Sequence, residues 1–258
     1  VLLTNTYWAL IHEAIHGILH PNSKKNMLLA RLSCLFFPSP FRIIRYGHLQ
    51  HHRFNRVMTI DQSEVYYPEK TNYFIACLSY YPRLLFGLYL AEVIGPILLF
   101  LPRKLVQAGV RGLLKNTPEA LKTAEINLLA KKALAELRLD SACIYLLLAA
   151  ALYCYGSHWY LLVIALLARG IIISVSDNLP HYATPLDDVY FAYNLRMPHW
   201  MAKLIYLNFN YHRVHHHYPM VPWNKLPEVF KLKDGVLDKN YFLQGLKQFQ
   251  GPIRADKL

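Results

Sequence analysis

The residues of this chain best suited to chemistry are histidines that recur at helical spacing. Two segments repeat the pattern His-x2-His-His, and a third carries the pair His-x3-His. On an α-helix this spacing places the imidazoles on one face, where their ring nitrogens can converge on a cation. These eight residues, which form three histidine boxes, are His12 and His16, then His48, His51 and His52, then His212, His215 and His216.

The three boxes predict a centre that binds two metal ions. Neutral imidazole suits zinc, copper, nickel and iron, and a site made almost wholly of nitrogen ligands with open positions favours a redox metal that performs oxygen chemistry. Eight histidines are too many for one ion, so we expect two ions, with iron as the first choice. The histidines expected to lie outside the centre are His20, His158, His199 and His217.

The first box also allows a hydrolytic interpretation. His12 to His16 spells H-E-x-x-H, the zinc metalloprotease signature, in which Glu13 would be the general base and Asp177 or Asp187 a third ligand. This interpretation leaves the other two boxes unused. If the metals are redox-active instead, Glu13 orients a ligand imidazole or is a solvated helix residue. A non-enzymatic membrane protein that binds metal or senses lipid is a further alternative.

The order of the boxes resembles the membrane fatty acid desaturase and hydroxylase superfamily over nearly the whole chain. The third box is followed by one residue and an aromatic-proline pair, Tyr218-Pro219, as in that family. The resemblance implies one further histidine ligand, supplied here by His181. Asp177 stands where stearoyl-CoA desaturases carry asparagine, and we retain it as a candidate catalytic residue. The three-residue spacer of the first box looks more like acyl-lipid desaturases and related hydroxylases.

The resemblance implies a specific chemistry for this site. Two iron ions would be held by nine histidines and would use dioxygen as co-substrate. The first choice of reaction is the introduction of a double bond into a fatty acyl lipid of the acyl-lipid type. Alternatives are a lipid or carotenoid hydroxylase or ketolase, and an oxidative fatty acid decarboxylase. The nine predicted ligands are His12, His16, His48, His51, His52, His181, His212, His215 and His216.

No sequence motif of this chain indicates an electron source within it. It contains neither a G-x-G-x-x-G dinucleotide fingerprint nor a cysteine cluster for an iron–sulfur centre, and no segment resembles a cytochrome b5 domain. We therefore expect an external donor such as ferredoxin or cytochrome b5. Such an acidic protein would be attracted by the basic segments Arg42 to Arg56 and Pro102 to Arg138.

Composition indicates a membrane protein. Of 258 residues, 54% are hydrophobic and 14% aromatic, above the usual range of soluble domains. The net charge of +12 comes without any nucleic-acid motif, so we expect basic loops beside a membrane and no nucleic-acid partner. The four cysteines lie in apolar segments without metal or disulfide spacing and are expected to act as small hydrophobes.

The predicted fold is an all-α integral membrane protein, with transmembrane helices and a cytosolic-side helical histidine-box domain that holds the dimetal centre. Residues 1–258 are expected to form one desaturase-like domain. Its N-terminal transmembrane part is expected to be truncated, because the apolar start is shorter than the about 20 residues a crossing needs. A tight hairpin is predicted over 141–155 and 160–175, with the turn at 156–159 facing away from the cytoplasm. The remaining expectations are a short surface helix at 26–37, a non-crossing stretch at 73–101 and basic amphipathic helices at 102–138.

Overall fold

The computed structural model describes residues 1–55, 66–87, 93–186 and 188–258. Arg56, Glu92 and Asp187 therefore lie outside the described residues. Within this part the protein is mostly helical, and its strands are two parallel pairs of two-residue segments. In one pair β1 (Tyr66–Tyr67) lies beside β4 (Ile253–Arg254), and in the other β2 (Leu195–Arg196) lies beside β3 (Lys239–Asn240).

Three consecutive helices at the N-terminus carry the first two histidine boxes. They are α1 (Thr4–Ile15), α2 (Ser23–Phe36) and α3 (Phe41–Phe54). The helix α1 ends at Ile15, and Gly17, which follows the cap residue His16, has a φ of +78°, a conformation that glycine adopts without strain. The surface helix predicted at 26–37 corresponds to α2 and ends before Pro38.

The three helices pack on one another around buried apolar residues. Ile11, Ile15, Phe37 and Phe41 are almost fully buried, and Ile173 of a later helix joins the same cluster. Polar contacts also fix the helix ends, because the Asn26 side chain donates to the Ala14 carbonyl at 2.9 Å and the Arg45 side chain donates to the Ile15 carbonyl at 3.2 Å. The helices of boxes one and two are therefore held in a fixed relation.

The middle of the chain is made of shorter helices. The stretch predicted as non-crossing is broken into α4 (Tyr73–Pro82), the π-helix η1 (Arg83–Gly87) and the 3-10 helix η2 (Gly95–Phe100), apart from the residues outside the description. The basic segment after it contains α6 (Arg103–Leu113), α7 (Pro118–Ala124) and the π-helix η3 (Glu125–Leu129). Leu129 packs inward while its basic neighbours are exposed, in agreement with amphipathic helices.

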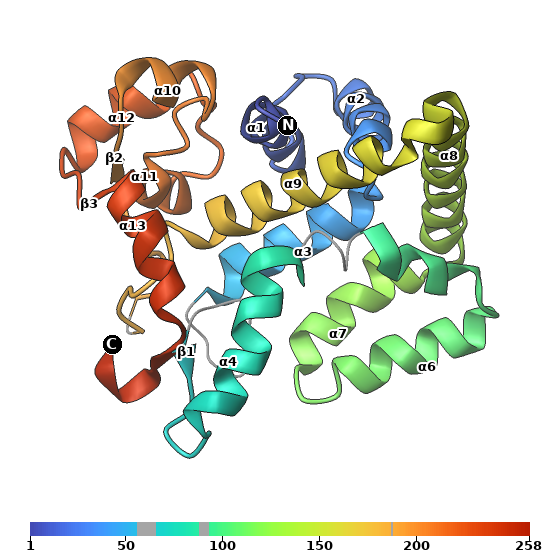
Figure 1. The fold of residues 1–258 in the computed structure, drawn as a ribbon, viewed down its shortest axis with the longest axis horizontal. Coiled ribbons are helices and arrows are strands. Elements are labelled where there is room, and N and C mark those ends of the chain that lie inside the picture. The colour runs from blue at the N-terminus through green and yellow to red at the C-terminus, as the bar shows by residue number, and fades with distance from the viewer. Residues whose placement is uncertain (56–65, 88–92, 187) are drawn as a thin grey trace.

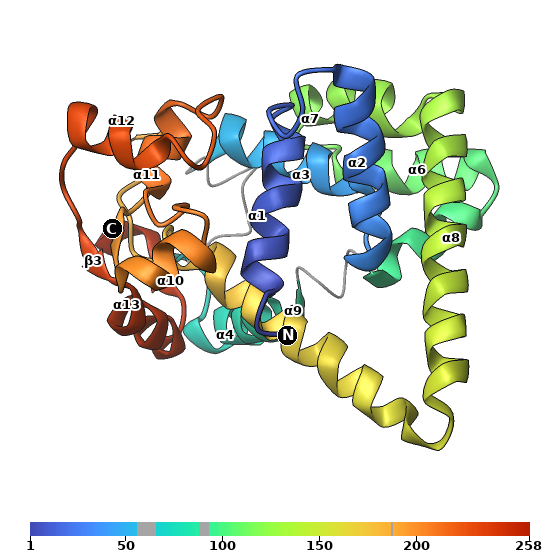
Figure 2. The ribbon, with the colours of Figure 1, turned by 90° about the horizontal axis from the view of Figure 1, so that it is seen from above.

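The two longest helices, α8 (Lys131–Tyr155) and α9 (Trp159–Asn178), meet at the 3-10 turn η4 (Gly156–His158). Figure 2 shows them diverging from this turn. The helix α8 begins ten residues before the predicted apolar run. Its first turns are anchored by ion pairs, with Arg42 donating to Glu136 at 2.9 Å and Arg31 donating to Asp140 at 3.0 Å.

By length and composition, one helical segment of the described part can cross a membrane, namely Lys131–Asn178. Of its most apolar 18 residues only 17% are buried, so it presents a large apolar surface that water would not favour. The helices α2 and α3 satisfy the same test only as one pair, bent by 104°. The protein is thus mostly helical with one or two candidate membrane spans, as predicted.

The C-terminal part gathers at one end of the molecule (Figure 1). It contains α10 (His199–Leu204), α11 (His212–His217), α12 (Leu226–Lys233), α13 (Tyr241–Lys247) and the 3-10 helices η5 (Gln248–Gln250) and η6 (Ala255–Lys257). The helix α9 runs from the turn at α8 toward this part and passes beneath α1 and α2 in Figure 1. It thereby brings residues 179–186 to the same place as the third box.

Candidate metal centre

The structure brings all nine predicted ligand histidines together and separates them into two groups. Within each group the candidate ligand atoms lie within 4.8 Å of one another. The five-histidine group consists of His12, His16, His48, His52 and His215, and the four-histidine group consists of His51, His181, His212 and His216.

The second and third boxes each contribute to both groups. On α3 the pair His48 and His52 joins the five-histidine group, whereas His51 joins the four-histidine group. On α11 the pair His212 and His216 belongs to the four-histidine group and His215 to the other. The i, i+4 pair of each helix therefore points to one group and the i+3 residue to the other, so α3 and α11 lie across both groups.

The ring nitrogens within each group approach closely. In the five-histidine group the Nε2 atom of His48 lies 3.0 Å from those of His16 and His52. In the four-histidine group the Nε2 atom of His212 lies 3.0 Å from that of His181 and 3.2 Å from that of His216. Such convergence of Nε2 atoms is the arrangement that imidazoles adopt around a cation.

The environment keeps these imidazoles neutral, which is the form that binds metal. His215 and His216 are 1% and 2% exposed. Burial lowers the pKa of both well below the usual histidine value, and neighbouring imidazoles lower it further. The pKa of His16 is lowered to about 4, mainly by burial and then by the positive charge of Arg45. The pKa of His212 is lowered to about 3, mainly by burial and then by the neighbouring His51.

The donor set fits metal ions on the geometry of this structure. Both ring nitrogens of His12 are buried and have no hydrogen-bond partner among the described residues. Buried polar atoms without a partner are costly, and an ion bound at the centre would satisfy such a nitrogen. The candidate ligands of both groups are nitrogen atoms, the donor type that iron, copper and zinc accept.

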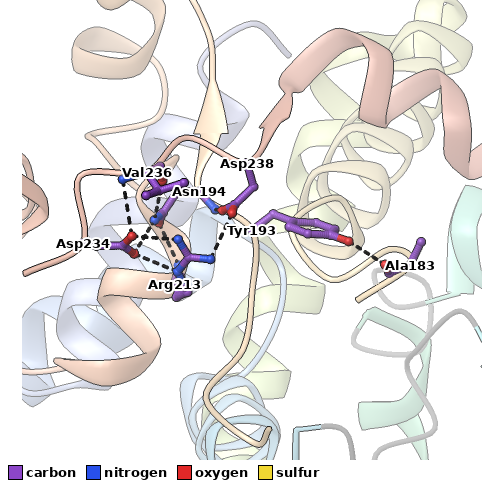
Figure 3. Close-up of polar contacts among 7 residues, drawn as sticks. All are labelled: Ala183, Tyr193, Asn194, Arg213, Asp234, Val236 and Asp238. Atoms are coloured by element: carbon purple, nitrogen blue, oxygen red, sulfur yellow. Dashed lines mark hydrogen bonds and ion pairs between the residues drawn. The ribbon is translucent and has the colours of Figure 1, made fainter. Parts of the chain in front are cut away.

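His181 reaches the centre from a tight turn after α9. Its backbone N–H donates to the Asn178 carbonyl at 3.1 Å, and the Thr184 hydroxyl donates to the His181 carbonyl at 2.9 Å. Two residues beyond His181, Ala183 has a φ of +62°. The Tyr193 hydroxyl donates to the Ala183 carbonyl at 2.6 Å, a contact drawn in Figure 3, so the turn is fastened from outside.

The third box is fastened by a polar cluster built around Arg213 (Figure 3). The Arg213 guanidinium pairs with Asp234 at 2.7 Å and with Asp238 at 3.0 Å. The Asn194 side chain accepts from the Arg213 backbone N–H at 3.1 Å and donates to Asp234 at 2.7 Å. We call these residues, Arg213, Asn194, Asp234 and Asp238, the arginine brace. The brace ties α11 to two segments that come before and after it in the chain.

Glu13 is 3% exposed, so the expectation of a solvated helix residue is wrong. It is a member of neither histidine group, and its expected role of orienting a ligand imidazole stays a prediction. Its carboxylate accepts from the Trp223 backbone N–H at 3.2 Å, and burial raises its pKa to about 7. Glu13 thus joins α1 to the chain that follows α11.

A pocket of about 580 Å³, open mouth included, adjoins both groups. His12 and His48 of the five-histidine group and His212 of the four-histidine group line it. The surface inside the pocket is largely apolar. The apolar residues that line it are Trp8, Ala9, Pro180, Leu195 and Phe209. The polar ones are Asn5, Ser176, Asp177, Tyr206, Asn210 and Tyr241.

The structure also places the other residues named from the sequence. Asp177 lies at the C-terminal end of α9, where it lines the pocket without belonging to either group. His20, His158, His199 and His217 likewise lie outside both groups. The pocket residues Asn5, Tyr206 and Tyr241 carry no motif and were not predicted. The sequence signal nearest to Asn5 was the first histidine box, which lies about two turns farther along the same helix.

Fold and site together define a helical, histidine-rich protein with candidate membrane spans and two histidine groups that could hold metal ions. The family model for fatty acid desaturases matches residues 1–245, so the chain belongs to the fatty acid desaturase family, a family of di-iron oxidoreductases. The resemblance noted from the histidine boxes is thereby confirmed. Comparison with curated proteins and with solved structures finds no match. Family membership decides against the metalloprotease interpretation of the first box.

Proposed function

We propose that this protein is an oxygen-dependent di-iron desaturase of the acyl-lipid type, which introduces a double bond into a fatty acyl chain. One observation carries the proposal: members of both histidine groups line a pocket whose surface is largely apolar. A hydrocarbon chain is the substrate that such a lining favours. Each of the nine grouped histidines is proposed as a metal ligand.

The iron ions, when bound, would supply the oxidising power that no side chain has, and dioxygen would be the oxidant. The chain's own residues have the remaining tasks. The nine imidazoles would present lone pairs to the ions, and burial keeps His215 and His216 neutral for this role. Trp8, Pro180 and Phe209 in the pocket wall would exclude water and restrain the chain so that one methylene faces the histidine groups.

Asp177 is proposed to touch the bound lipid because its side chain lines the same pocket as His12 and His48. Replacing Asp177 with asparagine keeps the shape of the side chain and removes its charge. If Asp177 acts in catalysis, kcat should fall in the Asp177→Asn variant while the iron content stays unchanged. A change in KM alone would assign Asp177 to substrate binding.

The proposal includes a membrane location, with the histidine boxes on the cytoplasmic side, and an external electron donor such as ferredoxin or cytochrome b5. It also treats residues 1–258 as one desaturase-like domain. Exposed lysines on α6, α7, the connection between them and the start of α8 support donor docking. They are Lys104, Lys115, Lys122, Lys131 and Lys132.

The decisive experiment is product analysis after reconstitution. Iron-loaded protein in lipid nanodiscs is supplied with a reduced donor, oxygen and deuterium-labelled acyl lipids, and the products are identified by mass spectrometry. A product lighter by two hydrogens supports the desaturase. A product that has gained an oxygen atom would identify a hydroxylase or ketolase instead. A terminal alkene shorter by one carbon would identify a decarboxylase. Zinc retention without turnover in the presence of iron and donor would overturn the oxidase altogether.

A further inference from the structure

One wall of the pocket carries a connected group of hydrogen-bonding side chains, which we call the hydroxyl cluster: Asn5, Ser176, Tyr206 and Tyr241. The Tyr206 hydroxyl stands at its centre. It accepts from the Asn5 amide at 2.8 Å, lies 2.9 Å from the Ser176 hydroxyl and contacts the Tyr241 hydroxyl. These residues come from α1, from α9, from the chain before α11 and from α13. Four separate elements thus converge on one polar spot in a largely apolar pocket.

The hydroxyl cluster does not satisfy its own hydrogen-bonding capacity. Three hydroxyl groups carry three hydrogens, and the two contacts among them use only two. One hydroxyl hydrogen therefore remains available. The Asn5 side-chain oxygen likewise has no hydrogen-bond partner among the residues that the structure describes. The cluster thus offers one donor and one acceptor that are not used within the described protein.

The distance between this cluster and the metal centre follows from α1. Asn5 and His12 both line the pocket and lie on the same helix, seven residues apart. Seven residues are two turns, or about 10 Å along the helix axis. Trp8 and Ala9, which lie between them in the sequence, also line the pocket. A chain bound in this pocket would contact the cluster about two helical turns from the histidine groups.

We propose that the substrate is an acyl lipid whose chain already carries a hydroxyl group, and that the hydroxyl cluster binds this group. A hydroxyl both donates and accepts, so it complements the Asn5 oxygen and the unused hydroxyl hydrogen together. An unsubstituted chain would cover both polar atoms without pairing them, which is unfavourable. The bound hydroxyl would lie about 10 Å from the carbon atoms presented to the metals. This inference rests on the proposed desaturase function and specifies its substrate.

The test measures binding rather than turnover. Iron-loaded protein is kept without oxygen and without donor, so that no reaction occurs. A stearoyl lysophospholipid and a series of hydroxystearoyl lysophospholipids, in which one hydroxyl is moved along the chain, compete for it in nanodiscs. We expect one positional isomer to bind at least about 10-fold more tightly than the stearoyl lipid, because sites built to pair a hydroxyl reject analogues that lack it.

Asn5→Leu should reduce this preference to about twofold or less, because it removes the acceptor. Thr6→Val is the matched control: Thr6 neighbours Asn5 and donates to the Leu204 and Ile205 carbonyls at 3.2 and 3.0 Å, but it does not line the pocket. The control should keep the preference. If Asn5→Leu fails to fold, Asn5→Ala, which also removes the acceptor, serves in its place.

The outcomes separate the two proposals. Equal binding of the stearoyl lipid and every hydroxy isomer by the wild-type protein overturns the hydroxyl inference and leaves the desaturase intact. An unchanged preference in a folded Asn5→Leu or Asn5→Ala variant also overturns it. If none of these acyl lipids binds, and none is oxidised once oxygen and donor are restored, the proposed function itself fails.

Discussion

Arg213 donates two hydrogen bonds, each 2.7 Å long, to the two carboxylate oxygens of Asp234. Arg213 lies on α11 next to His212, and α11 has only six residues. A helix this short is not stable alone, so contacts from the rest of the protein must hold it. The arginine brace supplies such contacts at the helix that serves both histidine groups.

Arg213→Ala should therefore weaken both stability and iron binding. We expect a loss of about 2–3 kcal/mol in the free energy of unfolding, because Asp234 and Asp238 are left with an unpaired, largely buried charge. Chemical denaturation of the iron-depleted protein measures this loss. Arg111→Ala is the control, since its pair with Glu125 is more than 40% exposed on both sides. Similar destabilisation by both changes would mean that the brace has no special role.

The two groups should respond differently to the loss of one histidine. His216→Ala leaves three histidines in its group, whereas His215→Ala leaves four in the other. Both variants should lose at least about 10-fold in activity, and His216→Ala should lose more iron. The residues are adjacent and both buried, so they form a matched pair. Iron analysis of purified protein tests this, with His158→Ala and His199→Ala expected to keep full occupancy.

Full activity with two irons in either His215→Ala or His216→Ala would contradict the ligand assignment. Equal iron loss in both variants would leave the ligands in place and contradict their division between two ions.

Acid should begin to destabilise the iron-depleted protein below about pH 6.5, where histidines of the unfolded chain take up protons. The pKa values of His16 and His212 in the folded protein are about 4 and about 3, whereas unfolded histidine titrates near 6.5. Between about pH 6.5 and 4 the unfolded chain binds more protons, so the free energy of unfolding falls as the pH is lowered. Urea unfolding at a series of pH values measures the slope. A slope that is unchanged in the double variant His16→Gln, His212→Gln would refute this cause.

The turn between α8 and α9 should face away from the cytoplasm. A thiol at Ser157 should react with an impermeant reagent only from that side, whereas a thiol at Lys104 should react only from the cytoplasmic side. The background must lack Cys154, because this native cysteine is exposed three residues from Ser157. Cytoplasmic labelling of Ser157→Cys would show that α8 and α9 do not form the predicted hairpin across the membrane.

Donor-dependent turnover should slow as salt increases, because screening weakens attraction between a basic surface and an acidic donor. Neutralising Lys104, Lys131 and Lys132 together should slow it further at low salt. Arg103 is less suitable for this test, since its side chain donates to the Leu129 carbonyl at 3.2 Å. Turnover by the purified chain with NADPH and no donor protein would refute the need for a donor.

Local sequence patterns predicted the features that interactions between neighbouring residues determine. The spacing of His48, His51 and His52 identified a helical histidine box, and the apolar run at 26–37 identified the helix that ends before Pro38. The same spacing did not reveal that His51 serves a different group from its neighbours, because that depends on how α3 crosses α11. Tertiary packing is not encoded in local periodicity.

The start of α8 and the hydroxyl cluster were missed for related reasons. Hydropathy predicted the helix only from residue 141, yet ion pairs of Glu136 and Asp140 with earlier helices extend it back to Lys131. Asn5, Ser176, Tyr206 and Tyr241 are ordinary residues spread over most of the chain. Only the folded arrangement shows that their side chains share one pocket.

The two histidine groups are completed at different points during synthesis of the chain on the ribosome. Four of the five histidines in one group have been made by residue 52, and only His215 is still to come. The other group has one histidine by that point, gains His181 much later and is completed at His216. A nascent chain can thus offer one nearly complete chelating site early, while the second forms only after the helical hairpin has been made. The order of the residues along the chain favours metallation in two stages.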